Sequence, residues 1–430
     1  MKPPRAFLTD LFDAALKAAD PFHSVPQYLP DPPRGRTIVV GAGKASARMA
    51  QALESAWAER GDGADLPDGL VIVPYGSRLP TERIEIVEAR HPVPDAAGEA
   101  AARRILETVS GLTEDDLVLC LISGGGSALL SVPGSGLTLA DKQAVNKALL
   151  ASGAAIGEMN CVRKHLSAIK GGRLAAAAAP AKVVTLTISD VPGDDPALIA
   201  SGPTVPGTTR PEDAMAILAR YQVAVPDAVT AFLETAAAQT PDAAALGISR
   251  LTTKVIATPQ ASLEAAAEIA RQQGVTPIIL GDTIEGEARD VGTVMAGIAR
   301  QVRRHGQPMA PPAVLITGGE TTVTVRGEAG RGGRNSEFLL AFAVASSDCP
   351  DLHAIACDTD GIDGSEDNAG AYWGPDIAAR AQAASLSARD YLDRHDAYSF
   401  FEAVDSLVVT GPTHTNVNDF RAIYIGAEGA

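Results

Sequence analysis

Short apolar segments rich in β-branched residues alternate with helical segments along most of the chain, and this alternation constrains the fold more than any other feature. The first four apolar segments are residues 37–40, 70–73, 117–122 and 183–188, and helical patterns over 44–60, 96–109 and 139–152 lie between them. Strands that are apolar throughout and separated by helices are typical of a parallel sheet covered on both faces. We therefore predict an α/β fold with a mostly parallel sheet. The third helix has Thr138 and Asp141 at the spacing of a capping box and is expected to stop at Gly153.

The chain has 430 residues, which is more than one hydrophobic core ordinarily supports, so we expect two domains. After Gly207 the sequence changes to two alanine-rich helical stretches over 211–239 and a polar stretch over 240–250, which we interpret as a connection. A second α/β series follows, with strands expected at 253–257, 277–280, 313–317, 321–326, 353–357, 407–409 and 422–425. The prediction is two α/β domains, over 1–239 and 250–404, with a small-molecule site in the cleft between them.

Composition and charge exclude several classes of protein. The net charge of −16 argues against a nucleic acid or an anionic membrane as partner. No apolar run approaches the roughly 20 residues of a membrane span, and the charged, proline-containing start does not resemble a signal peptide, so we expect a cytoplasmic protein. The four cysteines show no C-x-x-C pairing and are expected to be buried free thiols.

The segment TIVVGAGKASARMA, residues 37–50, has the strand, glycine turn and helix of a nucleotide site. Gly41 and Gly43 fit the dinucleotide fingerprint, but Ser46 replaces its third glycine and residues 74–77, PYGS, lack the acid that binds ribose. A P-loop also fails, because Ala45 replaces the hydroxyl that would bind magnesium. What remains is Lys44 at a helix start, where a cation is unfavourable unless it faces a bound anion. The alternative is an exposed lysine in the first turn.

Two further segments indicate anion binding. The loop LISGGGSALL contains Ser123, Gly124, Gly125, Gly126 and Ser127, whose backbone N–H groups can hold phosphate or carboxylate. A crowded crossover turn is the alternative. The segment CVRKHLSAIKGGR places Arg163, Lys164 and Lys170 close together with no carboxylate, as an anion site or as a solvated helix face.

Acidic loops follow other predicted strands. Residues 189–203, SDVPGDDPALIASGP, place Asp190, Asp194 and Asp195 where open α/β sheets bind ligands, and such carboxylates hold Mg²⁺ or accept a proton from an alcohol. One of the three can equally serve the turn alone. Residues 358–367, DTDGIDGSED, lack EF-hand spacing, so Asp360 is assigned to magnesium or nucleotide, with an acidic surface turn as the alternative.

Glycine, arginine and amide groups mark the second half of the chain. ITGGE contains Gly318, Gly319 and Glu320, and GEAGRGGRNSE contains Arg331, Arg334 and Asn335 on backbone flexible enough to wrap a ligand. THTNVND, with Asn416, is polar between two predicted strands and is expected to line a cleft or to join the domains. His91 and His165 are interpreted as packed or hydrogen-bonded residues rather than catalytic ones.

The motifs GAGKAS, LISGGGSALL, VRKHLSAIKGGRLA, ISDVPGDDPALIASGPT, GRGGRNSE, DTDGIDG and GPTHTNVNDF occur in this order over nearly the whole chain. Together they resemble the glycerate 2-kinase family with a C-terminal MOFRL domain, many of whose members are labelled hydroxypyruvate reductase. The resemblance implies transfer of the γ-phosphoryl group of ATP to the 2-hydroxyl of D-glycerate, giving 2-phospho-D-glycerate and ADP. It also implies a larger Rossmann-like domain, rejoined by residues 405–430, and a smaller MOFRL domain, with the active site between them.

The resemblance assigns the key lysine to Lys44 and the key arginine to Arg334, with Arg331 left open, and we add Asp190 to polarise the substrate hydroxyl. Our hypothesis is that Lys44 and Arg334 approach the phosphoryl group from the two domains and that closure excludes water. Nucleotide contacts are assigned to Gly41, Gly43, Ser123, Gly124, Gly125, Gly126, Ser127, Gly318, Gly319, Glu320, Arg331, Asn335 and Asp360. Substrate contacts are assigned to Arg163, Lys164, Lys170 and Asn416, and Mg²⁺ to Asp190, Asp194 and Asp360.

The partners expected from this assignment are D-glycerate, ATP and Mg²⁺, and a homodimer is left open. The alternative functions are an NAD(P)H-dependent hydroxypyruvate reductase, against which the imperfect fingerprint counts, and a non-catalytic sensor of small phosphorylated acids.

Overall fold

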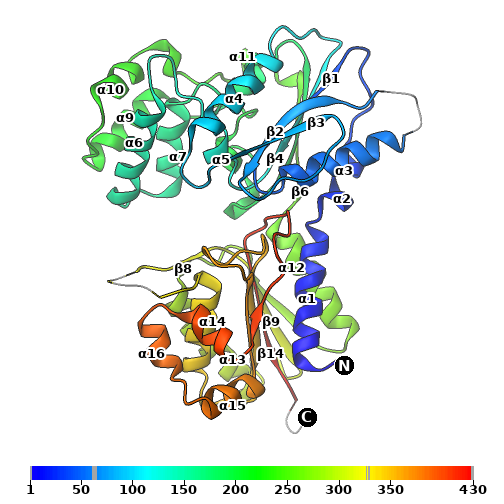
Figure 1. Cartoon of the computed structure of the whole chain (residues 1–430), viewed down its shortest axis with the longest axis vertical. Helices are drawn as coiled ribbons and strands as arrows, with labels where there is room; N and C mark the ends of the chain where they lie inside the picture. Colours follow the sequence, from blue (N-terminus) through cyan, green and yellow to red (C-terminus); the bar gives the residue numbers. More distant parts are fainter. Residues whose placement is uncertain (1, 61–64, 326, 328–329, 428–430) are drawn as a thin grey trace. The chain divides into compact units, whose positions relative to one another are not determined.

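A computed structural model describes residues 2–60, 65–325, 327 and 330–427. The chain divides into two compact units. One unit is Pro21–Ile256, and the other combines Met1–Asp20 with Ala257–Ala430. We call them the parallel-sheet unit and the mixed-sheet unit after the sheets they contain, and each is described by itself (Figure 1).

The parallel-sheet unit is built on six strands in the order β3-β2-β1-β4-β5-β6. Their bounds are β1 Thr37–Ala42, β2 Asp68–Pro74, β3 Ile84–Ala89, β4 Leu117–Ile122, β5 Lys182–Ile188 and β6 Leu251–Ala257. The pairs β1–β2, β2–β3, β1–β4 and β4–β5 are all parallel. This is the strand order of the Rossmann fold, with its reversal between β1 and β4.

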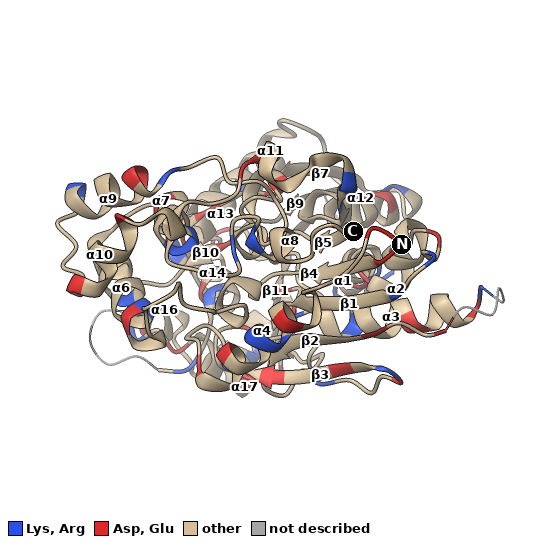
Figure 2. Cartoon of the chain, turned by 90° about the horizontal axis from the view of Figure 1, so that it is seen from above, with Lys and Arg blue, Asp and Glu red and all other residues tan. Residues whose placement is uncertain are grey.

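Helices cover both faces of this sheet because its strands are apolar on both sides. The helices are α2 Pro21–Ser24, α3 Ser46–Ala58, α4 Ala96–Thr108, α5 Gly126–Leu129, α6 Leu139–Ser152, α7 Ile156–His165, α8 Arg173–Ala177, α9 Pro211–Arg220, α10 Asp227–Leu233 and α11 Ala243–Leu246. Ile105 of α4 packs in one buried cluster with Val40 and Cys120, whereas α3 contacts β2 and β4. The edge strand β3 carries Glu85 and Glu88 (Figure 2), charges that discourage pairing with another chain.

A helical layer made of α6, α7, α9 and α10 adjoins the sheet and has its own buried cluster, which includes Val145, Val162 and Phe232. The predicted capping box at the start of α6 is present, with Thr138 and Asp141 bonded reciprocally, and Gly153 ends the helix in the left-handed conformation. The alanine-rich stretches of the sequence form α9 and α10 within this unit.

The mixed-sheet unit has six strands in the order β13-β12-β11-β14-β9-β7, and a short sheet of β8 and β10. The strand bounds are β7 Thr276–Gly281, β8 Gly286–Glu287, β9 Ala313–Thr317, β10 Thr321–Thr322, β11 His353–Asp358, β12 Gly370–Trp373, β13 Leu407–Val408 and β14 Asp419–Ile425. β7 and β9 are parallel, whereas β14 is antiparallel to both β9 and β11. A strand was predicted over 321–326; of its described residues, 321–325, only Thr321–Thr322 forms a strand, and residue 326 lies outside the described part of the chain.

Helices cover this second sheet on both faces as well. They are α1 Pro4–Ala18, α12 Pro259–Gln272, α13 Ala288–His305, α14 Arg334–Ala345, α15 Pro375–Ala383, α16 Ala388–Asp393 and α17 Ala397–Ala403. In Figure 1, α1 and α12 lie on one side of β9 and β14, and α13 and α14 lie on the other. No helix in the described part of the chain is long and apolar enough to span a membrane.

The ends of the chain correct the domain boundaries expected from the sequence. Residues 405–430 do not rejoin the first domain, because β14 is a central strand of the second sheet. The first 20 residues also belong there: Phe7 of α1 packs edge-on against Tyr424 of β14, and Thr415 donates to the carbonyl oxygen of Ala19. The physical reason is the apolar stripe of α1, with Phe7, Leu8 and Leu11 fully buried.

Candidate functional site

Two glycine loops meet at the switch point of the parallel sheet, where β1 and β4 end side by side. The backbone N–H of Lys44 donates to the carbonyl oxygen of Gly124 at 2.8 Å. The N–H of Ala45 donates to Oγ of Ser123 at 2.9 Å, and Oγ of Ser46 donates to the carbonyl oxygen of Leu121 at 2.9 Å. Ligands of open α/β sheets bind at this position, so the fold places Lys44 where the sequence predicted an anion.

Both loops need glycine, because the backbone has a positive φ and a side chain would meet neighbouring atoms. Gly43 has φ +145°, and a Cβ there would lie 2.1 Å from Oγ of Ser123. Gly125 has φ +79°, and a Cβ would lie 3.1 Å from the ring of His91 and 3.5 Å from Cγ of Lys44. The side chains of Lys44 and His91 therefore flank the backbone of Gly125 closely. Any larger residue here would displace them.

The second loop continues into a cluster of hydroxyl and ammonium groups. Nζ of Lys170 donates to the carbonyl oxygen of Ser127 and to its Oγ, the latter at 3.0 Å. Oγ of Ser127 also bonds to Oγ of Ser201 at 2.9 Å. Ala200 and Ser201 both have positive φ although they are not glycines. Non-glycine residues are held in this strained region mainly at functional sites.

A cavity of about 380 Å³ opens beside Gly125 within the parallel-sheet unit. It lies between the Gly125 loop, the loop after β3, α6 and α7. Its lining residues are His91, Pro92, Val93, Pro94, Gly125, Ser127, Ala128, Ser131, Lys142, Gln143, Asn146, Leu150, Arg163 and Lys170. Three of them are cationic and none is a carboxylate, so the cavity is suited to a small anion (Figure 2 shows basic residues on α6 and α7).

Burial lowers the pKa of the basic groups in this cavity. The pKa of Lys142 falls to about 8, chiefly through burial, and Arg163 and Arg173 lower it further while Glu99 raises it. The pKa of Lys170 lies well below its usual value, through burial and then the charges of Lys142, Arg163 and Lys164. The described residues offer these groups little compensating negative charge.

The other predicted basic residues divide by role. Arg163 donates to the amide oxygens of Asn146 and Asn160. The pKa of Lys164 is lowered by burial, against which the charge of Asp195 acts. Arg173 bonds to five backbone carbonyl oxygens, those of Lys164, Lys170, Ala237, Ala238 and Gln239, and is therefore structural.

The acidic loop after β5 offers one unusual carboxylate. Asp194 has φ +55°, and its Oδ1 is buried with no hydrogen-bond partner among the described residues. Asp195, in contrast, accepts from the N–H of Ala197 at 2.9 Å. A buried carboxylate oxygen without a donor is suited to a cation. The residues that the structure describes contain no group of three or more His, Cys, Asp or Glu that could hold a metal by themselves.

Arg334 opens helix α14 in the mixed-sheet unit and is surrounded by carboxylates. Its Nε donates to Asp419 at 2.8 Å, its Nη2 to Asp358 at 2.8 Å and its Nη1 to Glu320 at 2.7 Å. Burial tends to lower its pKa, but the charges of Asp419, Asp358 and Glu320 outweigh it and raise the pKa above its usual value. The guanidinium is therefore always charged and fixed in direction.

The remaining residues predicted in this unit are not all beside Arg334. Arg331 bonds to Glu366 at 2.7 Å and stacks 3.9 Å from the centre of the Tyr398 ring, with half of its side chain exposed. Asn335 is fully buried, and its side-chain amide donates to the carboxylate of Asp419. In the parallel-sheet unit, Oγ of Ser123 accepts from the backbone N–H of Ala45. Both side chains therefore bond to protein.

Backbone turns account for the other predicted groups of the mixed-sheet unit. Gly318 accepts from the buried Arg421, and Gly319 accepts from the N–H of Asp419. Asp360 accepts from the N–H of Ile362 in its own loop, and Asn416 accepts from the N–H of Asn418. These residues shape the loops around Arg334.

A second cavity, of about 420 Å³, borders Arg334 and includes Gly330, Gly332 and Gly333. Glu337 and His395 also line it and bond to each other at 3.0 Å, and both contact Arg289. A Cβ on Gly333 would lie 2.4 Å from Asp363, the buried carboxylate that caps α14 through the N–H groups of Asn335 and Ser336.

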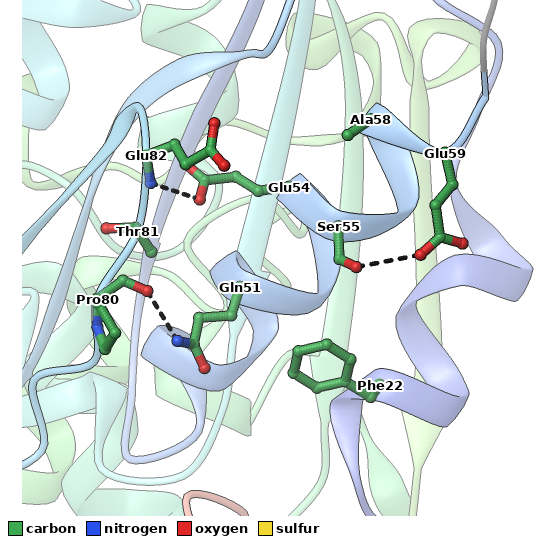
Figure 3. A pocket seen from close by; sticks show the side chains of 9 residues that line it. All are labelled: Phe22, Gln51, Glu54, Ser55, Ala58, Glu59, Pro80, Thr81 and Glu82. Carbon is green, nitrogen blue, oxygen red and sulfur yellow. Dashed lines mark hydrogen bonds between the residues drawn. The ribbon is translucent and has the colours of Figure 1, made fainter.

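A third cavity, of about 610 Å³, lies between α3 and the loop before β3 (Figure 3). Its most buried carboxylate, Glu54, accepts from the backbone N–H groups of Glu82, Arg83 and Ile84. Gln51 likewise donates to the carbonyl oxygen of Pro80. These polar groups fix a loop, so we do not assign this cavity to a ligand.

Among the residues that line the cavity beside Gly125, Lys142 was not singled out from the sequence, and His91 was interpreted as a packed or hydrogen-bonded residue. No motif contains them, because they come from a loop and a helix remote in sequence from Lys170. A usable signal was the spacing of Lys142, Asn146 and Leu150 on one face of α6, beside the core positions Val145 and Leu149. His165 is structural as expected, with both ring nitrogens bonded, to Ala238 and Thr209.

Comparisons with known proteins agree with this layout. Residues 7–234 match a domain of unknown function, DUF4147, and residues 313–419 match the MOFRL family. A protein of Agrobacterium vitis named "Putative hydroxypyruvate reductase" is 55% identical over 98% of this chain and 94% of its own length. The D-glycerate 2-kinase of Thermotoga maritima is 38% identical over 95% of both chains. The crystal structure of a glycerate kinase from the same organism is similar with a TM-score of 0.87 at 37% identity, covering 98% of this chain and 99% of that one.

Proposed function

The chain belongs to the family that joins a DUF4147 domain to a MOFRL domain, and we propose that it is a D-glycerate 2-kinase. The reaction transfers the γ-phosphoryl group of ATP to the 2-hydroxyl of D-glycerate and gives 2-phospho-D-glycerate and ADP. The names of the Thermotoga maritima relatives support the substrate class.

The observation that carries the proposal is the junction of two glycine loops at the switch point, with Lys44 between them and a cationic cavity beside Gly125. Phosphoryl transfer needs little covalent help from the protein. It needs the reacting groups positioned and the charge on the phosphate oxygens neutralised. A lysine whose backbone is bonded to the glycine loop, next to a cavity for an organic anion, meets both needs.

Roles follow from these positions. Lys44 neutralises charge on the transferring phosphoryl group, while the backbone of Gly124 and Gly125 faces its oxygens; the N–H of Gly126 instead donates to the carbonyl oxygen of Ser123 at 3.2 Å. Lys170 and Arg163 bind the carboxylate of D-glycerate, because both line the cavity without a carboxylate partner of their own. Asp190, at the C-terminal end of β5, polarises the 2-hydroxyl as it becomes the nucleophile.

Arg334 is the arginine that we assign to the nucleotide phosphates, in preference to Arg331. Its guanidinium is held by the buried Asp358 and Asp419, and its third partner, Glu320, is half exposed and can exchange for a phosphate oxygen. Arg331 instead lies on the surface against Glu366 and Tyr398.

Mg²⁺ fits the chemistry of the loop after β5. Asp194 presents a buried carboxylate oxygen to which none of the described residues donates, and Mg²⁺ in phosphoryl-transfer enzymes is held by one or two carboxylates together with substrate phosphates. When bound, the ion neutralises charge on the phosphate oxygens. Asp194 is therefore our ligand for it, with Asp190 as the neighbouring carboxylate.

The test is product formation from D-glycerate, ATP and Mg²⁺, read through enolase with no phosphoglycerate mutase present. Signal without the mutase identifies 2-phosphoglycerate and supports the proposal. Signal only after the mutase is added would place the phosphate at the 3-position and overturn the assigned orientation of the substrate.

The same preparation tests the reductase alternative with hydroxypyruvate and NADH. The geometry counts against it: Ser46 replaces the third glycine of the fingerprint, and β2 ends at Pro74 with Tyr75 after it, where an acid would bind ribose. NADH consumption without phosphorylation would overturn the kinase proposal.

A further inference from the structure

The cavity beside Gly125 carries more positive charge than D-glycerate neutralises. Lys142, Arg163 and Lys170 line it, and none of its lining residues is an Asp or a Glu. Their hydrogen-bond partners are amide, hydroxyl and backbone carbonyl oxygens, none of which is an anion.

The charged groups around Lys142 do not neutralise its ammonium group. Arg163 and Arg173 repel its ammonium group, and so does the neighbouring Lys170. Glu99 of α4 attracts it, but the carboxylate of Glu99 is bonded to Arg103 at 2.6 Å. Among the described residues, the ammonium group itself has one weak acceptor, the carbonyl oxygen of Val132 at 3.4 Å. Lys142 is therefore a cation held near the cavity without an anion of its own.

The cavity is also larger than D-glycerate requires. Its 380 Å³ corresponds to roughly a dozen water volumes of about 30 Å³ each. A three-carbon hydroxy acid fills only part of that space. A phosphate group on the same acid adds about −1.5 to −2 units of charge at neutral pH, so the phosphorylated acid offsets the mutual repulsion of Lys142, Arg163 and Lys170 better than the free acid does.

We propose that this cavity binds the phosphorylated hydroxy acid in preference to the free acid, and that Lys142 supplies the charge that makes the difference. The inference rests on the proposed function, because it takes 2-phospho-D-glycerate as the product. It adds a residue to the site and a consequence for catalysis: the product is retained and competes with D-glycerate for the same cavity.

The lowered pKa of Lys142 gives the proposal an independent signature. Near pH 8 this lysine is partly deprotonated in the free protein. An anion that arrives beside it favours the charged form, so binding takes up protons from solution. Free D-glycerate, which does not need Lys142, takes up fewer.

The experiment is isothermal titration calorimetry of the full chain without nucleotide, using 2-phospho-D-glycerate, D-glycerate and inorganic phosphate as ligands. At pH 8 it is repeated in two buffers of different ionisation enthalpy to count protons. We expect 2-phospho-D-glycerate to bind about tenfold or more tighter than D-glycerate, because charge-assisted hydrogen bonds are strong. K142Q should weaken the phosphorylated ligand about tenfold, leave D-glycerate within about threefold, and abolish the excess proton uptake. K142R should retain the preference.

Lys147 supplies the matched control, since it is exposed on the same helix and does not line the cavity. K147Q should bind all three ligands as the wild type does. Equal weakening of both acids by K142Q, or no preference in the wild type, would overturn the inference. So would inorganic phosphate that binds as tightly as 2-phospho-D-glycerate. If K142Q does not fold, K142R still decides the matter: it should keep the preference and lose the excess proton uptake, because arginine stays charged at pH 8, and a K142R that keeps the uptake would overturn the inference.

The two proposals fail in different ways. A protein that phosphorylates D-glycerate but shows no preference for the phosphorylated acid would contradict only the present inference. A protein that prefers 2-phospho-D-glycerate through Lys142 but does not turn over D-glycerate and ATP would contradict only the proposed function.

Discussion

Arg334 donates from Nε to Oδ1 of Asp419 at 2.8 Å, and the side chain of Asp419 has no exposure to solvent. Asp358 accepts from Nη2 of the same guanidinium at 2.8 Å and is also buried. The arginine is therefore fixed by two carboxylates that cannot leave, and only its Nη1 edge, bonded to Glu320, is available for exchange. Arg331 differs from Arg334 in this respect, because it is paired with Glu366 at the surface and is not held by buried carboxylates.

We expect R334K to lower kcat/KM about 10²- to 10³-fold, because lysine keeps a charge but loses the bidentate geometry that orients phosphate. R334A should in addition destabilise the fold by about 3–5 kcal/mol, since Asp358 and Asp419 would be left buried without their partner. Thermal unfolding and initial rates measure the two effects.

R331K is the matched comparison, and its activity should stay within about threefold of wild type because exposed ion pairs contribute little. A large loss in R331K with little in R334K would reverse the assignment of the key arginine.

The ammonium group of Lys44 is predicted to act on the phosphoryl group, so K44A should lower kcat about 10²- to 10³-fold. The unfolding temperature should change little, because the bond to Gly124 is made by the backbone of Lys44 and survives the substitution. K147A, on an exposed face of α6, is the control. Activity of K44A within threefold of the control would remove Lys44 from the chemistry.

The close contact at Gly43 predicts that G43A is damaging. Its Cβ would lie 2.1 Å from Oγ of Ser123 and its φ is +145°, so the two loops must separate. We expect a loss of about 1–3 kcal/mol in the free energy of unfolding together with most of the activity. G157A, in a helix with no atom near its Cβ, should be neutral or stabilising by up to about 1 kcal/mol. Denaturant titration distinguishes the two, and equal stability would contradict the role of the loop junction.

Much of this site follows from local sequence patterns. Strand β4 and the glycines after it, the Thr138 capping box and the turn at Gly43 each depend on neighbouring residues, which is why they could be predicted. The pairing of strands that are far apart in the sequence could not be predicted in this way. Nothing near β14 shows that Ala422 pairs with Ile355 and Ile316, so the end of the chain was assigned to the wrong unit.

Lys142 shows the same limit within the site. Its local pattern is that of a helix with only Val145 and Leu149 buried, and only the packing of α6 beside the Gly125 loop brings Lys142 to the cavity. The glycine motifs predict where an anion would bind, whereas the basic residues beside that position are brought in by tertiary structure.

Asp194 leads to a prediction about metal dependence. Because its Oδ1 is buried and has no donor within the described part of the chain, D194N should raise the Mg²⁺ concentration needed for half-maximal activity about tenfold, and chelation should abolish turnover of the wild type. D195N is the control, since Asp195 is already used by the N–H of Ala197. An equal shift in both variants would mean that the loop, and not the Asp194 carboxylate, is responsible.

Lys142 predicts an unusual dependence of stability on pH. Its pKa falls from 10.5 in the unfolded chain to about 8 in the folded protein, so the unfolded chain binds more protons between these values and stability rises with pH there. Below about pH 8 the full cost of the buried charge is present, of order 1–3 kcal/mol. K142Q removes that cost. It should be more stable than wild type at pH 7, and the difference should shrink as the pH rises toward 10.5. Urea titrations of both proteins at pH 7, 8.5 and 10 measure this, with K147Q as the control. A difference that grows with pH, or that appears equally in K147Q, would show that Lys142 is not held uncompensated beside the cavity.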